Sequence, residues 1–190
     1  MKVLFTGLGS IGQRHLRNLR ELLGDSVEVL AYRIRREVPM LNDRLQVVEG
    51  GSIKDKYGVV EFDDLDKALA EKPDIVFVTN PTSMHMEVAR KSAEAGCHLF
   101  IEKPLGASSE GVDELIELVE RKRRVVFVAY QLRFHPGLMQ VSTWLKEERI
   151  GQLISANLLL GEYMPGFHPY EDYRKTYPAL KSMGGGVLLS

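Results

Sequence analysis

A glycine-rich turn near the N-terminus constrains this chain more than any other feature. An apolar run over residues 2–6 leads directly into Gly7-Leu8-Gly9-Ser10-Ile11-Gly12, and a helical pattern begins immediately afterwards. Gly7 lets the chain turn tightly, Gly9 lets the backbone approach a pyrophosphate, and Gly12 lets helix and strand pack closely. The N-terminus of the following helix then faces the anion. Since a strand precedes the turn and a helix follows it, we expect a dinucleotide site formed by Gly7, Gly9, Ser10, Ile11 and Gly12.

Short apolar segments alternate with helical patterns over the first 130 residues. Strands are expected at 2–6, 27–32, 59–62, 74–78, 98–101 and 125–129, with helices between most of them. This spacing is typical of βαβ units, which form a parallel sheet with right-handed crossovers. Residues 1–130 are therefore predicted to be an α/β domain of the Rossmann type, a doubly wound parallel sheet that binds a dinucleotide.

The pattern changes after residue 130. Residues 138–149 are typical of a helix, and residues 153–163 are typical of a long strand. Such a strand cannot stand alone, because its edges must be paired and one face covered. The chain stops shortly after Gly184-Gly185-Gly186, a segment typical of a turn entering another element. We expect residues 131–190 to be the start of a second, truncated domain.

Composition argues for a small-molecule partner. The formal net charge is -1 in 190 residues, whereas general binding to nucleic acid or to a membrane surface needs a basic field. No apolar stretch approaches the length of a transmembrane span or has the form of a signal peptide. Cys97 is the single cysteine, so no internal disulfide is possible and a reducing compartment is favoured. A cytoplasmic location is expected.

The end of the second predicted strand bears on the choice of dinucleotide. NAD sites usually place a carboxylate there to hold the ribose 2′-hydroxyl. Here the sequence is Tyr32-Arg33-Ile34-Arg35-Arg36, with no carboxylate before Glu37. Guanidinium groups suit a 2′-phosphate, so NADP is favoured over NAD, with Arg33 the strongest candidate. The alternative is that these arginines are ordinary solvent-exposed residues at the start of a loop.

Two further segments follow neighbouring predicted strands, at the edge where ligands bind in open α/β sheets. Asn80, Pro81 and His85 follow the fourth strand, and Glu102-Lys103-Pro104 follows the fifth. The proline biases Lys103 away from helical geometry, so its side chain can be aimed into the cleft. If the cleft buries it, Lys103 can carry a proton to or from a substrate hydroxyl, with Glu102 as its orienter. An ordinary loop lysine is the alternative.

Several segments in this order and spacing resemble one known family, the Gfo/Idh/MocA oxidoreductases, which include glucose-fructose oxidoreductase and inositol dehydrogenase. The segments that carry the resemblance are Gly7, Gly9 and Gly12, Asn80-Pro81-Thr82-x-x-His85, Glu102-Lys103-Pro104, Arg133-Phe134-x-Pro136 and Gly184-Gly185-Gly186-x-Leu188-Leu189. The resemblance implies an N-terminal Rossmann domain followed by an α/β domain whose open antiparallel sheet covers the substrate. It also implies hydride transfer between a nicotinamide and a hydroxyl-bearing carbon of a sugar or cyclitol.

The resemblance also implies roles for individual residues. Lys103 matches the family's catalytic lysine, and Pro81 and His85 match the loop beside the nicotinamide, to which we add Asn80 and Glu102 as cofactor-binding candidates. Arg133 matches the turn into the second domain and is a candidate for substrate binding. Family members commonly associate through the second domain's sheet, so a homo-oligomer is expected.

Departures from the family pattern leave alternatives open. Many members place an aspartate where Ser190 stands here, followed four residues later by a catalytic histidine, which lies beyond the end of this chain. The chain is therefore expected to be the front part of a longer enzyme or a shortened, inactive relative. If the chain is a shortened, inactive relative, the hypothesis is a non-catalytic dinucleotide-binding module that oligomerises through its C-terminal strand. A cofactor-assisted sugar lyase or hydrolase is a third reading.

The remaining polar residues carry weaker signals. His15 is expected to be a surface or packing residue, because its helix should point away from the cleft beyond its first turn. Tyr173 and Arg174 lie in an aromatic-rich loop and can line a sugar site, with loop packing an equal alternative. His135 and His168 have no ligand-type neighbours at metal spacing, so no metal site is expected.

Overall fold

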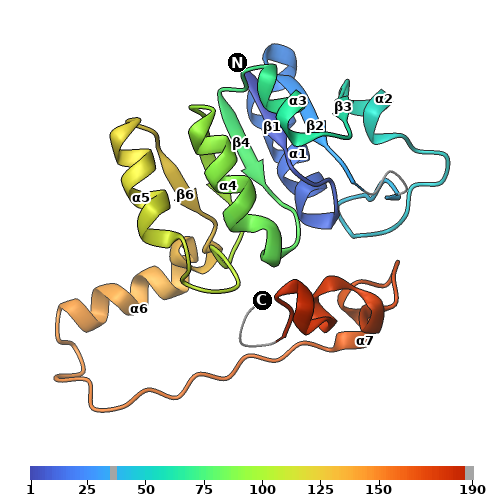
Figure 1. Ribbon diagram of the computed structural model, residues 1–190. Helices are drawn as coiled ribbons and strands as arrows, with labels where there is room; N and C mark the ends of the chain where they lie inside the picture. The colour runs from blue at the N-terminus through green and yellow to red at the C-terminus, as the bar shows by residue number, and fades with distance from the viewer. Residues whose placement is uncertain (35–37, 187–190) are drawn as a thin grey trace.

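The computed structural model describes residues 1–34 and 38–186 of the chain. Its main feature is a parallel sheet of six strands in the order β3-β2-β1-β4-β5-β6 (Figure 1). The strands are β1 (Lys2–Phe5), β2 (Glu28–Tyr32), β3 (Val60–Phe62), β4 (Ile75–Val78), β5 (His98–Ile101) and β6 (Val126–Val128). The strand order reverses between β1 and β4, which places the ligand crevice of such a sheet at the carboxyl ends of these two strands. The predicted Rossmann-type α/β fold is confirmed.

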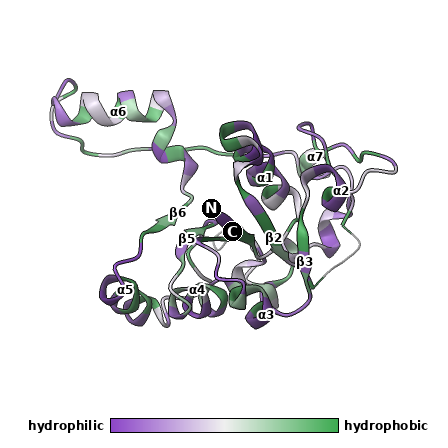
Figure 2. Ribbon diagram, turned by 90° about the horizontal axis from the view of Figure 1, so that it is seen from above, coloured by the Kyte–Doolittle hydropathy of each residue, from purple (hydrophilic) through white to green (hydrophobic). Residues whose placement is uncertain are grey.

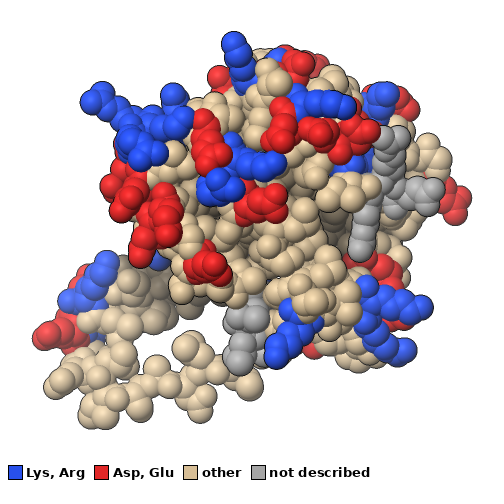
Figure 3. Space-filling model, viewed as in Figure 1, with Lys and Arg blue, Asp and Glu red and all other residues tan. Residues whose placement is uncertain are grey.

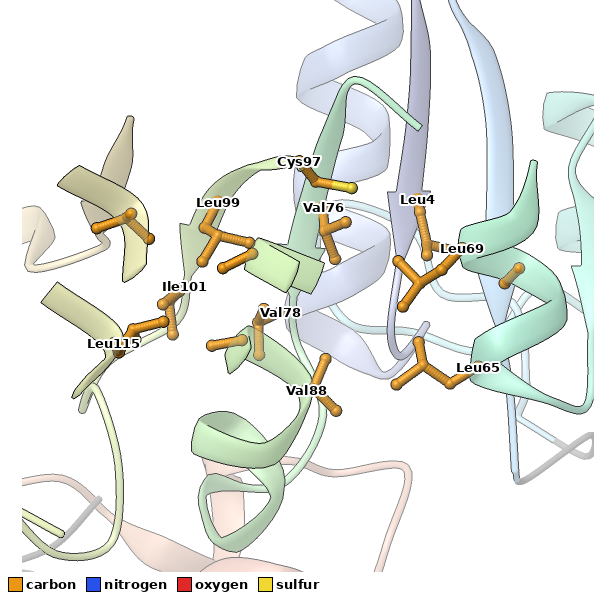
Figure 4. Close-up of a cluster of buried hydrophobic side chains, with 14 of the residues drawn as sticks. Leu4, Leu65, Leu69, Val76, Val78, Val88, Cys97, Leu99, Ile101 and Leu115 are labelled. Carbon is orange, nitrogen blue, oxygen red and sulfur yellow. The ribbon is translucent and has the colours of Figure 1, made fainter. Parts of the chain in front are cut away.

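Helices cover both faces of the sheet. They are α1 (Ser10–Leu23), α2 (Ile53–Tyr57), α3 (Leu65–Ala70), α4 (His85–Glu94) and α5 (Val112–Arg121). Alternate residues of β1 point to opposite faces, so Val3 and Phe5 join a core with Leu16 of α1, whereas Leu4 joins the core of α3, α4 and α5. Figure 4 shows this second core, with Val88 of α4 near Val78 of β4. Burial on both faces explains why the inner strands β1 and β4 are nearly continuous apolar runs, whereas the edge strands β3 and β6 are more exposed.

The predicted strand at residues 153–163 does not form. After α6 (Pro136–Lys146), the chain runs without regular structure to α7 (Met164–Phe167). Leu158, Leu159 and Leu160 are 89%, 99% and 88% exposed, and no described residue pairs with this segment. A strand needs hydrogen bonds along its edge and cover for its apolar face, and the described part of the chain supplies neither. This prediction was wrong for the chain as it stands.

The C-terminal segment returns to the carboxyl edge of the sheet. Figure 1 shows it in red, below the ends of β1 and β4, and Figure 2 shows α6 projecting away from the sheet. It comprises α7 and the short 3-10 helices η4 (Tyr173–Lys175), η5 (Tyr177–Ala179) and η6 (Lys181–Met183). A Cβ on the buried Gly184 would lie 3.2 Å from the Cβ atoms of Ala107 and Thr82. Close packing at Gly184 therefore joins this segment to the loops that follow β4 and β5.

Candidate functional site

The glycine turn is packed tightly at two glycines and open at the third. A Cβ on Gly7 would lie 2.9 Å from the carbonyl oxygen of Thr79, and one on Gly12 would lie 2.1 Å from the carbonyl oxygen of Gly7. The Thr79 hydroxyl donates to that same Gly7 oxygen at 2.7 Å, which ties the turn to the end of β4. A Cβ on Gly9 would meet no atom within 4 Å. Gly7 and Gly12 thus serve packing, whereas Gly9 leaves free space beside the backbone.

This space lies at the N-terminus of α1. Gly9 is the N-cap residue, no side chain caps the helix there, and its first turn holds no acidic residue. The first N–H groups of a helix lack partners within the helix and carry a partial positive charge. Ser10 and Ile11, the first residues of the helix, are half-buried. The turn therefore offers an anion a set of backbone donors without a competing carboxylate.

Arg33 lies at the carboxyl end of β2, as expected, but it is buried and already engaged. Its guanidinium Nη1 donates to a carboxylate oxygen of Glu61, which lies on β3, and its backbone N–H donates to the Phe62 carbonyl oxygen at 3.0 Å. The residue is only 9% exposed. Arg33 is therefore not an ordinary solvent-exposed residue at the start of a loop. The carboxylate of Glu61 neutralises part of its charge. Arg35 and Arg36 lie outside the described residues.

The loop after β4 carries an amide with unmet hydrogen-bonding capacity. Both the nitrogen and the oxygen of the Asn80 side-chain amide are buried without a partner among the described residues. Buried polar atoms in folded proteins are nearly always hydrogen-bonded, so such a pair of atoms indicates a place for a polar ligand. Pro81 directly precedes the short helix η2 (Thr82–Met84) and is half-buried.

His85 joins the two loops of this edge. It is 1% exposed, and its ring nitrogens lie 2.9 Å from the carbonyl oxygen of Asn80 and 2.8 Å from that of Pro104. The ring thus spans the loop after β4 and the loop after β5. The role of His85 beside the nicotinamide stays a prediction.

Lys103 lies at the carboxyl end of β5, as expected, and its side chain is exposed. The burial invoked for proton transfer is not supplied by the described residues. Glu102 does not orient the Lys103 ammonium in this structure: its Oε2 instead accepts a hydrogen bond from the Lys103 backbone N–H, at 3.2 Å. The carboxylate therefore acts on the backbone of Lys103.

The other oxygen of Glu102 contacts His15, whose helix was expected to point away from the cleft. His15 Nε2 lies 2.6 Å from Glu102 Oε1, and the two side chains are only 16% and 12% exposed. The His15 ring also packs against Phe77 of β4 and Phe100 of β5, with ring centroids 5.8 Å and 4.9 Å away. The packing prediction holds, but α1 does not point away from the site. It lies across the sheet, so a side chain in its second turn reaches the end of β5.

The C-terminal segment places two tyrosines over this edge. Burial raises the pKa of Tyr170 to about 12, and its interaction with Ser10 lowers that pKa by less. Burial, together with the nearby carboxylate of Glu102, also raises the pKa of Tyr177. Residues far apart in the sequence therefore meet at the glycine turn and at the loop after β5.

The expected substrate residues are less well grouped. Arg174 and Tyr173 lie together in η4, with the guanidinium carbon 5.3 Å from the ring centroid. Arg133 is exposed, in the 3-10 helix η3 (Gln131–Phe134).

The shift at Tyr170 predicts a loss of stability in alkali. Its folded pKa of about 12 lies above its ordinary value of 10.0, so the unfolded chain loses this proton first. The contribution is fully present below pH 10.0 and is lost as the pH rises toward about 12. The unfolding free energy, measured by urea denaturation at about pH 9 and about pH 11, should fall less in Tyr170→Phe than in the parent. Tyr163→Phe, at a residue that is 79% exposed, is the matched control and should behave like the parent. Identical falls in all three proteins would contradict the burial of Tyr170.

A small pocket lies beside the end of β2. It has a volume of about 190 Å³ and is bounded by Tyr32, the loop after β3 and α4. Three aspartates contribute to its wall, namely Asp63, Asp64 and Asp66. Elsewhere on the face seen in Figure 3, acidic and basic side chains are interspersed over the sheet domain.

Two features are absent from residues 1–34 and 38–186. No helix there is both long enough and apolar enough to cross a bilayer. No group of three or more His, Cys, Asp or Glu residues in the same ranges could hold a metal ion.

Comparison with known proteins gives consistent matches over the sheet domain. The family model GFO_IDH_MocA, described as the oxidoreductase family with an NAD-binding Rossmann fold, matches residues 1–130. Myo-inositol 2-dehydrogenase of Thermotoga maritima is 29% identical over 154 residues, which are 80% of this chain and 42% of that protein. Levoglucosan dehydrogenase of Pseudarthrobacter phenanthrenivorans is 32% identical over 125 residues, 65% of this chain and 31% of that protein.

A solved structure agrees with these matches in fold. The WlbA dehydrogenase from Bordetella pertussis, in complex with NADH and UDP-GlcNAcA, superimposes with a TM-score of 0.65 at 22% identity, covering 78% of this chain and 43% of that one. The chain spans less than half the length of these three relatives.

Proposed function

The chain belongs to the Gfo/Idh/MocA oxidoreductase family, and we propose that it carries the cofactor half of an enzyme that transfers a hydride between a nicotinamide and a hydroxyl-bearing carbon of a sugar or cyclitol. The observation that carries the proposal is the 2.6 Å contact between His15 and Glu102, because it brings the Lys103 loop against the helix of the glycine turn. The relatives named above are dehydrogenases, which gives the non-catalytic reading no support.

The residues present fit a nicotinamide dinucleotide. Gly9 leaves open space at an uncapped helix N-terminus, where Ser10 and Ile11 would help to hold the pyrophosphate. The unpartnered amide of Asn80 would gain hydrogen bonds from the nicotinamide half, near Glu102. The pocket beside Tyr32 lies at the β2 end, where the adenosine half belongs in this fold.

The preference for NADP rests on Arg33. A guanidinium at the carboxyl end of β2 suits a 2′-phosphate, and Glu61 holds it in place. The same carboxylate reduces its charge, and Asp63, Asp64 and Asp66 nearby oppose a phosphate, so the preference is expected to be modest. NAD is the second choice.

Arg33→Ala should separate the two dinucleotides. Affinity for NADPH is expected to fall about tenfold or more, because a charge-assisted contact to phosphate is lost, whereas affinity for NADH changes little. Fluorescence titration with each nucleotide measures both. Arg90→Ala removes an exposed arginine paired with Glu94 and should leave both affinities as they are. Tighter binding of NADH than of NADPH by the parent chain would overturn the assignment of Arg33.

The chain's own residues would divide the chemistry between them. When bound, the nicotinamide supplies a hydride acceptor or donor. Lys103 would take the proton of the substrate hydroxyl during oxidation and return it during reduction. Arg133, Tyr173 and Arg174 would contact the sugar. Tyr177 and the bound substrate would exclude water from Lys103, which is exposed in this structure.

Turnover tests this function. The natural protein that carries this chain should reduce NADP⁺ or NAD⁺, followed by absorbance, with at least one member of a panel of sugars and cyclitols. Cofactor binding without turnover on any member of the panel would contradict the proposal. Conversion of a sugar with the cofactor unchanged at the end would instead mark the cofactor-assisted lyase or hydrolase. We also propose that the protein is cytoplasmic and that it forms a homo-oligomer. Light scattering of the purified protein would test the oligomeric state.

A further inference from the structure

Glu102 connects two parts of the site through its two carboxylate oxygens. Oε1 lies 2.6 Å from His15 Nε2 on α1, and Oε2 accepts from the Lys103 backbone N–H at 3.2 Å. The Glu102 backbone N–H donates to the Val78 carbonyl oxygen at 3.0 Å, which fixes the residue against β4. The carboxylate is therefore the one side chain in the described ranges that joins the glycine-turn helix to the backbone of Lys103.

The His15 ring is itself held in one place. Phe100 meets it edge to face at 4.9 Å between centroids, and Phe77 lies tilted at 5.8 Å. His15 and Glu102 are respectively 16% and 12% exposed, so water competes little for their hydrogen bond. A ring packed in this way directs Nε2 at Glu102 without a loss of side-chain freedom on ligand binding.

We propose that His15 is a positioning residue that acts through Glu102. It would hold Lys103 at a fixed position relative to the dinucleotide bound at the N-terminus of α1, the helix that carries His15. The inference rests on the proposed function, since it assigns Lys103 to proton transfer. Helix α1 would then position two groups. Its N-terminus would hold the pyrophosphate, and His15 in its second turn would position Lys103. Small displacements of a proton-transfer group lower the reaction rate strongly. Substitution of His15 is therefore expected to lower kcat and to leave the affinity for the cofactor nearly unchanged.

Two substitutions separate the hydrogen bond from the packing. His15→Phe keeps an aromatic ring against Phe77 and Phe100 but cannot donate to Glu102. His15→Gln keeps a donor of similar reach and loses the ring. In the natural protein, His15→Phe should lower kcat about tenfold or more and change the dissociation constant for NADPH less than about threefold. His15→Gln should recover most of the lost kcat. Equal kcat in the parent and in His15→Phe would overturn the proposal.

A double substitution tests whether the effect passes through Glu102. If it does, His15→Phe adds little further loss of kcat to Glu102→Gln, because the connection is already weakened. Independent losses that multiply in the double variant would overturn the proposed route.

A measurement without substrate distinguishes this inference from the proposed function. The backbone amide resonance of Lys103, observed by ¹H–¹⁵N NMR in the isolated chain, should move in His15→Phe and stay near its parent position in His15→Gln. An unmoved resonance in His15→Phe would overturn the positioning role. A moved resonance together with a parent protein that turns over no substrate would contradict the proposed function and leave the contact between His15 and the Lys103 loop established.

Discussion

Gly9→Ala is expected to abolish tight dinucleotide binding in a chain that still folds. The backbone of Gly9 has φ -66°, which alanine adopts freely, and its Cβ would meet no protein atom within 4 Å. The methyl group would instead fill the space at the start of α1 that a pyrophosphate needs. The affinities for both NADPH and NADH should fall at least about tenfold, or ~1.4 kcal/mol, since each carries the pyrophosphate.

Gly12→Ala is the matched comparison, and here the expected loss is in the free energy of unfolding. Its Cβ would lie 2.1 Å from the Gly7 carbonyl oxygen, so the backbone of the turn must move. Overpacking of this kind lowers the free energy of unfolding by about 1–3 kcal/mol or more, measured by urea denaturation. Gly9→Ala should unfold like the parent. If Gly9→Ala bound the dinucleotides like the parent, the pyrophosphate could not lie at this turn.

Lys103→Ala should have the largest effect on turnover. Loss of a general acid/base lowers the rate by about 10²–10⁴-fold, while the affinity for NADPH stays nearly the same because no cofactor contact depends on the ammonium. Steady-state kinetics of the natural protein, with a nucleotide titration beside them, measure the two quantities. Lys54→Ala removes an exposed lysine of α2 and should leave both unchanged. Unaltered turnover in Lys103→Ala would remove Lys103 from the mechanism.

Local patterns predicted the sheet because its inner strands, such as β1 and β4, are buried on both faces. The expected strand at residues 98–101 matches β5 at both ends, since Leu99, Phe100 and Ile101 form a short apolar run that follows Gly96 and precedes a polar loop. The glycine turn, Asn80 and Lys103 were placed at one edge because the carboxyl ends of parallel strands meet there. The position of each follows from topology, and the roles stay predictions.

Contacts between distant residues could not be predicted in the same way. His15 and Glu102 are 87 residues apart, and Arg33 and Glu61 are 28 apart. Periodicity gives the face that a side chain occupies but not which side chain it meets across a helix and a sheet. The strand expected at 153–163 failed for a related reason: apolar composition favours a strand, but only a pairing partner makes one.

Calorimetric titration of the purified chain with NADPH, and separately with NADH, tests most directly whether this fold holds a dinucleotide. The expected result is one dinucleotide bound per folded chain, tighter binding of NADPH than of NADH, and loss of both signals in Gly9→Ala. A folded parent chain that binds neither nucleotide would contradict it.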